Sequence, residues 1–139
     1  MSTRSYIGMK LDDGTVVGVY CHSDGYLSHN GKILLENYNT KEKVDELLKQ
    51  GNISFLDKEI GDKHGFDCND RPEGVSTFYG RDRGESDQGA QTFISEIEFL
   101  MECTENYTYL FKDGKWYWRM WNNKELHELT AEHIANDKG

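Results

Sequence analysis

The stretch that decides the fold is residues 5–22, SYIGMKLDDGTVVGVYCH. Apolar side chains occupy every second position from Ile7 onward, which is the pattern of a half-buried strand. Asp13-Gly14 is a strong signal for a short hairpin turn. The return segment, 16–22, is rich in valine, whose branched side chain suits a strand. The stretch therefore predicts a β-hairpin.

A second hairpin is predicted nearer the C-terminal end. Residues 107–111 and 116–121 have the composition of strands, and Asp113-Gly114 joins them as a turn. A shorter apolar segment, 75–79, predicts one middle strand between the two hairpins.

Helical periodicity fills the gaps between these strands. The clearest case begins at a capping residue, Asn39 or Thr40, and ends at Gly51. Between them Val44, Leu47 and Leu48 recur at i, i+3 and i+4. Residues 31–38 and 124–136 predict two further helices. Residues 52–73 have no clear periodicity and predict irregular structure.

A fourth helix is predicted from the capping box SEIE that begins at Ser95. Ile94 precedes the box and is placed to pack against Phe99 as a hydrophobic staple. Helical spacing also predicts the inward face of this helix. It consists of Ile97, Leu100, Met101 and Thr104.

Length and element order together predict the fold class. A chain of 139 residues is long enough for one hydrophobic core, and its 36% apolar content with 12% aromatic residues means that large rings supply much of it. We expect a single α+β domain over 1–139. Its antiparallel sheet is built from two β-hairpins plus a middle strand, with helices packed on one face.

Charge and cysteine content narrow the partners and the compartment. A net charge of −9 argues against direct nonspecific binding to nucleic acid, whose phosphates attract basic proteins. The scattered acidic residues favour a solvated surface, and an acidic face that mimics nucleic acid is the alternative. Three distant cysteines and the lack of an apolar leader or membrane span predict a cytoplasmic protein with reduced thiols.

The densest polar cluster is the loop 20–29, which follows the first hairpin. Its candidate ligand-binding residues are His22, Asp24, Tyr26 and His29. Imidazole and carboxylate groups suit zinc or ferrous iron, so one interpretation is a metal site made by His22, Asp24 and His29. The other is a turn in which Asp24 bonds main-chain amides. The spacing matches no specific metal motif, and the sequence predicts no cofactor.

A second cluster, 79–85, has the sequence YGRDRGE. If it is extended, Arg81 and Arg83 project to the same side. Together with Tyr79, and with Arg4 from the start of the chain, they would then make an anion site. The alternative is a solvated loop in which neighbouring acidic residues neutralise the arginines.

Two other features carry weaker hypotheses. A nucleophilic thiol at Cys21 or Cys68 would need a histidine, and His22 points to the opposite face of its strand from Cys21. The aromatic side chains of the second hairpin suit a homodimer interface. They are Trp116, Tyr117, Trp118 and Trp121.

Several motifs together resemble a known kind of protein. They are STRSYIG at 2–8, YCHSDGY at 20–26, GKILLENY at 31–38, YGRDRGE at 79–85 and YLFKDGKWY at 109–117. The chain resembles small accessory proteins encoded by bacteriophages, prophages and mobile elements of bacteria. The resemblance implies a role in the host cytoplasm, where such proteins blunt host defences by binding an enzyme or sequestering a signal molecule. It implies no catalytic residue.

Three functions follow as hypotheses. The first is a non-enzymatic, phage-type binding protein, an anti-defence factor that binds a host protein or a small anionic, nucleotide-like ligand. Proximity of the loops 20–29 and 79–85 would favour the small ligand. The second is a metal-dependent or hydrolytic enzyme centred on residues 22–29. The third is a structural or regulatory homodimer.

Overall fold

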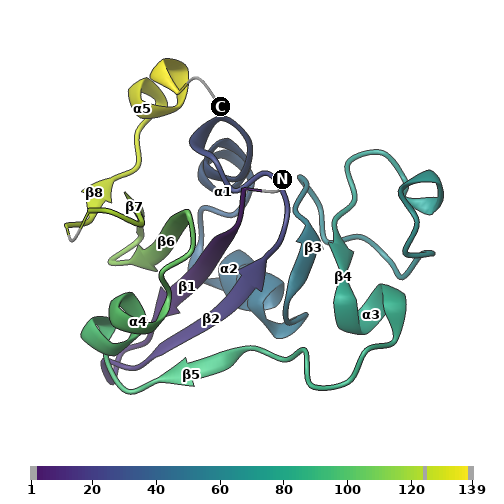
Figure 1. The fold of residues 1–139 in the computed structure, drawn as a ribbon, viewed down its shortest axis with the longest axis horizontal. Coiled ribbons are helices and arrows are strands. Elements are labelled where there is room, and N and C mark those ends of the chain that lie inside the picture. The colour runs from purple at the N-terminus through teal and green to yellow at the C-terminus, as the bar shows by residue number, and fades with distance from the viewer. Residues whose placement is uncertain (1–2, 124, 138–139) are drawn as a thin grey trace.

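The computed structural model describes residues 3–123 and 125–137, and its strands form one eight-stranded sheet (Figure 1). The strands are β1 (Ser5–Lys10), β2 (Val16–Cys21), β3 (Ile53–Phe55), β4 (Thr77–Phe78), β5 (Gln91–Phe93), β6 (Tyr107–Lys112), β7 (Lys115–Met120) and β8 (His127–Glu128). Their order is β4-β3-β2-β1-β6-β7-β8, and β5 pairs with β2 beside this path.

Both predicted hairpins are present. β1 pairs with β2, and β6 with β7, in antiparallel register. The second turn has φ of 54° at Asp113 and 76° at Gly114, the left-handed pair that Asp-Gly turns favour. A parallel pairing of β1 with β6, from Ser5↔Tyr107 to Met9↔Phe111, joins the hairpins into one sheet.

The helices are short, and side chains cap several of them. They are η1 (Leu27–Gly31, a π-helix), α1 (Lys32–Asn37), α2 (Lys41–Lys49), η2 (Cys68–Asp70, a 3₁₀ turn), α3 (Tyr79–Arg83), α4 (Glu96–Glu102) and α5 (Ala131–Asn136). Thr40 caps α2 by accepting a 3.2 Å hydrogen bond from the Lys43 amide. Ser95 caps α4 by accepting a 3.1 Å bond from the Glu98 amide, as its capping box predicts.

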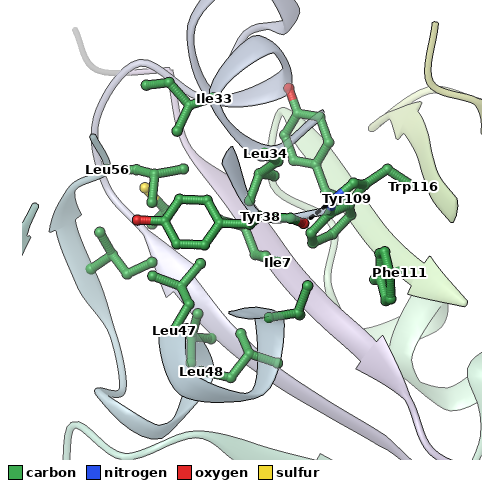
Figure 2. Close-up of a cluster of buried hydrophobic side chains, with 14 of the residues drawn as sticks. Ile7, Ile33, Leu34, Tyr38, Leu47, Leu48, Leu56, Tyr109, Phe111 and Trp116 are labelled. Atoms are coloured by element: carbon green, nitrogen blue, oxygen red, sulfur yellow. Dashed lines mark hydrogen bonds between the residues drawn. The ribbon is translucent and has the colours of Figure 1, made fainter. Parts of the chain in front are cut away.

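The larger hydrophobic core lies between the sheet and helices α1 and α2 (Figure 2). Alternate residues of the central strands, such as Ile7 in β1, point into it. Leu34 of α1 and Leu47 of α2 are fully buried against them. Burial of each such side chain stabilises the fold by about 1.5–3 kcal/mol. The predicted inward stripe of α2 is confirmed.

Helix α4 packs on the opposite face of the sheet. Its Phe99 lies over Gly8 and Gly18, which are paired across β1 and β2. The expected inward stripe of α4 is therefore wrong, because Phe99 and Cys103 are buried while Ile97 and Met101 face solvent.

The α+β class, with a mostly antiparallel sheet and both hairpins, is confirmed. The expectation that helices cover one face holds for α1 and α2, and α4 departs from it. The middle strand shortens to β4, because residues 79–83 form α3 instead of extending it. The predicted helix 124–136 is only α5, preceded by β8; Lys124 lies outside the described residues.

Within residues 3–123 and 125–137, no helix has the length and apolar character that crossing a membrane requires.

Candidate functional site

The loop after β2 is fixed by buried polar contacts. The Nδ2 group of buried Asn30 donates to Ser5 Oγ at 3.1 Å and to Cys21 Sγ at 3.3 Å. The Tyr109 hydroxyl donates to the Gly25 carbonyl. A Cβ atom at Gly25 would lie 2.9 Å from that of Ser5, so glycine permits this close approach. These contacts hold the backbone of the loop in one conformation at the end of β2.

His22 lies beside Tyr20 on the face of the sheet that α4 partly covers. The Tyr20 hydroxyl and His22 Nδ1 are 2.8 Å apart and hydrogen-bonded. Burial raises the pKa of Tyr20, and the nearby positive charge of Arg4 opposes that rise. Arg4 and His22 therefore both lie close to the Tyr20 side chain on this face.

The expected metal ligands do not converge. The imidazole Nε2 of His29 is 3.0 Å from the Leu56 carbonyl oxygen, and its ring packs 5.1 Å from that of Phe55. No group of three His, Cys, Asp or Glu side chains in the described part of the chain could hold a metal ion. His22, Asp24 and His29 thus form no metal site in this structure.

Asp24 and Tyr26 shape the turn of this loop. Asp24 has φ of 53°, a left-handed conformation that Asp tolerates in turns. The Tyr26 ring packs edge-on against His29, with centroids 6.3 Å apart. Burial raises the pKa of Tyr26, and the Asp24 carboxylate raises it further. The chain therefore turns at Asp24, whose main-chain carbonyl accepts a 3.3 Å hydrogen bond from the Asn30 amide. Among the described residues, the expected bonds from main-chain amides to the Asp24 carboxylate are not found.

Arg81 is committed to the structure around it. Its guanidinium donates to both carboxylate oxygens of Asp82, at 2.9 and 3.2 Å. It also donates to the carbonyls of Ile60, Gly61 and Ser76, at 2.8, 2.8 and 3.0 Å. Because its guanidinium makes all these hydrogen bonds, Arg81 is not available to a ligand. Its role is to hold residues 60–61 against α3.

Asp82 is the buried partner in this network. Burial alone would raise its pKa, but hydrogen bonds from Arg81 and from the main-chain amides of Phe78 and His64 hold the pKa below its ordinary value. The carboxylate is therefore held ionised by its donors.

Arg83 points elsewhere than Arg81, because the segment is helical and not extended. Its guanidinium lies over the Phe66 ring, 5.0 Å from the centroid, and its Nε is 3.5 Å from Glu85. The Tyr79 ring packs 5.6 Å from the same phenylalanine. The expected placement of Arg81 and Arg83 on one side of an extended segment is therefore wrong, and Arg83 and Tyr79 instead meet at Phe66.

A hollow of about 270 Å³ lies where the loop after β2 meets β3, β4 and the segment that connects these two strands. Three hydroxyl side chains, two aromatic rings and one arginine line it. They are Ser23, Ser54, Thr77, Phe55, Phe66 and Arg71. None of the eight predicted site residues lines this hollow, but His29, Tyr79 and Arg83 contact its two rings.

Asn52 ties the two predicted loops together. Its Oδ1 accepts a 2.9 Å hydrogen bond from the Tyr20 amide, and its carbonyl accepts a 3.2 Å bond from the Tyr79 amide. Its Nδ2 donates to Gln88 Oε1 at 3.0 Å. Segments 20–29 and 79–85 are therefore neighbours, as strands β2, β3 and β4 are in Figure 1.

Arg71 is the cation of the hollow. Its Nη1 donates to Asp57 Oδ2 at 2.9 Å and to the Val75 carbonyl at 3.0 Å. Its guanidinium lies 4.4 Å from the Phe55 ring centroid. These contacts fix the plane of the guanidinium at the hollow, where its remaining N–H groups can meet an acceptor.

Sequence reasoning missed Phe66 and Arg71, because residues 52–73 have no periodicity and their segment reaches the sheet through tertiary contacts. The available signal was a phenylalanine, together with an arginine, in the polar and irregular residues 61–73. In the described part of the chain, larger hollows lie elsewhere, of about 720 Å³ near Tyr38, about 640 Å³ between the two hairpin turns and about 490 Å³ beside α4. None of these three is lined by a predicted ligand-site residue.

Cys21 and Cys103 do not support nucleophilic chemistry. Cys21 is fully buried, and burial raises its pKa to about 11, so almost no thiolate forms near neutral pH. Burial raises the pKa of Cys103 to about 12. The side chain of Cys68 lies outside the described residues.

Comparisons with protein-family models, with curated proteins and with solved structures find no match for this chain.

Proposed function

We propose that this protein is a non-enzymatic binding protein of the phage accessory kind, which takes a small anionic, nucleotide-like ligand in the hollow beside β3 and β4. The observation that carries the proposal is one hollow with mixed chemistry, lined by Ser23 of the loop after β2, by residues of β3 and β4, and by Phe66 and Arg71 of the segment between those strands. The aromatic walls suit a flat ring, the hydroxyls suit its polar edge, and Arg71 suits a phosphate or carboxylate.

Size and charge limit the ligand. The hollow, about 270 Å³, is near the lower end of small-molecule pockets, which begin at about 300 Å³. It fits the base or the phosphate of a mononucleotide, with the rest of the ligand on the neighbouring surface. Arg71 is paired with Asp57 and Arg83 with Glu85. Arg83 lies over the Phe66 ring of the hollow and is the more exposed of the two arginines, so it is the second cation for the exposed part of the ligand. In the host cytoplasm, sequestering such a ligand would remove a signal that a defence system needs.

The experiment is native mass spectrometry of protein purified gently from bacterial cells with and without phage infection, followed by titration with AMP, GMP, cyclic AMP and a cyclic dinucleotide. We expect a bound mass or saturable binding of at least one of these nucleotides. Ser54→Phe fills the hollow and should abolish binding. Thr92→Phe, at an exposed position of β5 outside the hollow, is the matched control and should leave it unchanged.

An apo mass with no binding of any tested nucleotide would overturn the small-ligand proposal. So would equal binding by Ser54→Phe and the wild type, because the ligand would then lie elsewhere.

A further inference from the structure

The most apolar stripe of α4 faces solvent. Ile97 is 70% exposed and Met101 is 73% exposed, one helical turn apart. Trp121, at the end of β7, is 63% exposed. Among the residues that the structure describes, the exposed large apolar side chains all lie in two segments, 94–101 and 120–121. Such a gathering is typical of a docking surface.

A groove of about 490 Å³ runs between α4 and the end of β7. Ile97, Leu100 and Met101 form one wall, and Trp121 lies across from them. The groove is open, and its walls are mostly apolar. It is separate from the hollow beside β3 and β4, with which it shares no residue.

Arg119 gives the groove a buried positive charge. Arg119 is only 8% exposed, yet it lines part of the groove. Its Nη2 donates to the Leu100 carbonyl near the end of α4, while its buried Nε has no hydrogen-bond partner in the described part of the chain. No ion pair joins Arg119 to any acidic side chain of residues 3–123 and 125–137. A buried charge without a counter-ion is costly, and an incoming carboxylate would offset that cost.

The acidic residues of α4 do not supply this counter-ion. Glu96 is held by Lys112 at 3.1 Å and Lys10 at 3.4 Å. Glu98 accepts a hydrogen bond from the Ile94 amide at the start of the helix. Glu98 and Glu102 follow Ile97 and Met101 by one position each, so they lie on the side of that ridge away from Leu100.

A second copy of this chain is a poor occupant. Two copies of α4 facing each other would bring Glu98 and Glu102 of each close to those of the other, in a protein of net charge −9. Two unpaired arginines would also meet. Charge complementarity therefore points to a different partner, with an apolar group and an anionic one.

We propose that the groove between α4 and the end of β7 docks a segment of a partner protein in which a carboxylate side chain stands beside a bulky apolar side chain. The carboxylate pairs with the Arg119 guanidinium, and the apolar side chain lies between Met101 and Trp121. This is an interaction surface in addition to the proposed ligand site.

The test is selection of a random peptide library, displayed on phage, against the immobilised full-length chain. We expect enrichment of peptides with Asp or Glu within four positions of Trp, Phe or Leu. In fluorescence anisotropy, changing that acid to its amide should weaken the best peptide by about tenfold or more, the usual effect of losing a charge-assisted hydrogen bond.

Protein variants locate the binding. Met101→Glu should weaken the peptide at least about tenfold, because it puts a like charge on the ridge at an exposed position that the fold does not need. Ile94→Glu is the matched control, equally exposed and outside the groove lining, and should leave affinity unchanged. Arg119→Gln should also weaken binding, with its melting temperature measured alongside since Arg119 contacts Leu100.

Several results would overturn the proposal: no enriched peptide, enriched peptides without an acid, or affinity unchanged by Met101→Glu. Concentration-dependent dimers that Met101→Glu abolishes would assign the groove to a second copy instead.

Discussion

The indole Nε1 of Trp116 donates a 2.8 Å hydrogen bond to the main-chain carbonyl of Tyr38 (Figure 2). Trp116 lies in β7 and Tyr38 directly follows α1, so this bond joins the second hairpin to the helical layer. Both residues are buried, and the carbonyl depends on the indole for its partner. The contact adds to the β1–β6 pairing in holding the two halves of the chain together.

Trp116→Phe should lower the free energy of unfolding by about 2 kcal/mol or more, because it leaves the buried Tyr38 carbonyl without its donor and removes part of a packed ring. Urea denaturation should show a lower midpoint with an unchanged slope. Trp121→Phe, at an exposed position, is the control and should change stability little. Equal stability of both variants would show that the bond contributes nothing.

Gly8→Ala should destabilise the protein by about 1–3 kcal/mol, since a Cβ atom at this position would lie 2.7 Å from the Phe99 ring. The matched control is Gly89→Ala, where no atom lies within 4 Å, and it should be neutral or slightly stabilising. Adding Phe99→Leu to Gly8→Ala should recover part of the loss. Strict additivity in this double-mutant cycle would contradict the contact.

Both hairpins could be predicted because their signals are local: alternation on each strand and Asp-Gly at the turn. The parallel pairing of Ser5 with Tyr107 could not, since the two residues are 102 positions apart and nothing near either specifies the other. The same holds for the single pairing of Cys21 with Ile53 that places β3 next to β2.

The orientation of α4 escaped prediction for a specific reason. Its apolar stripe at Ile97 and Met101 indicates an inward face, but the Gly8–Gly18 pair of the sheet beneath has no side chains and leaves room for a ring. Phe99 fills that gap, so the helix is turned to bury it and leaves the stripe outside. Packing across the sheet overrode periodicity.

The candidate site was predicted only in part. Loops 20–29 and 79–85 are neighbours, which their sequences suggested as one of two arrangements. The roles of the arginines differ from the expectation. Because residues 79–83 form helix α3, Arg81 points toward Asp82 and bonds to it, while Arg83 points toward Phe66. Arg71 came from a stretch without periodicity.

Asp82→Asn should destabilise the protein by about 3 kcal/mol at pH 7, because it leaves the largely buried Arg81 without its counter-ion. The folded state holds the pKa of Asp82 below the ordinary value of 3.8. Its contribution is therefore full above about pH 4 and is lost as the pH falls through the lowered pKa. Urea denaturation from pH 7 to pH 2.5 should show the two proteins converging. Asp62→Asn, at an exposed position, is the control, and a difference that is constant with pH would contradict the ionised network.

The last prediction concerns the thiols and bears on the enzyme alternative. In a Cys68→Ser variant, iodoacetamide at pH 8 should label neither Cys21 nor Cys103 until urea unfolds the protein. Only a thiolate reacts, both side chains are buried, and burial raises the pKa of Cys21 to about 11. The unfolded thiols ionise near their ordinary pKa of 9.0, so stability should also fall as the pH rises from about 9 to about 11. Mass spectrometry of tryptic peptides assigns the label to each cysteine. Rapid labelling of Cys21 in the folded protein would mean that solvent reaches a reactive thiolate beside the His22 loop, and a nucleophilic enzyme would then become the better hypothesis.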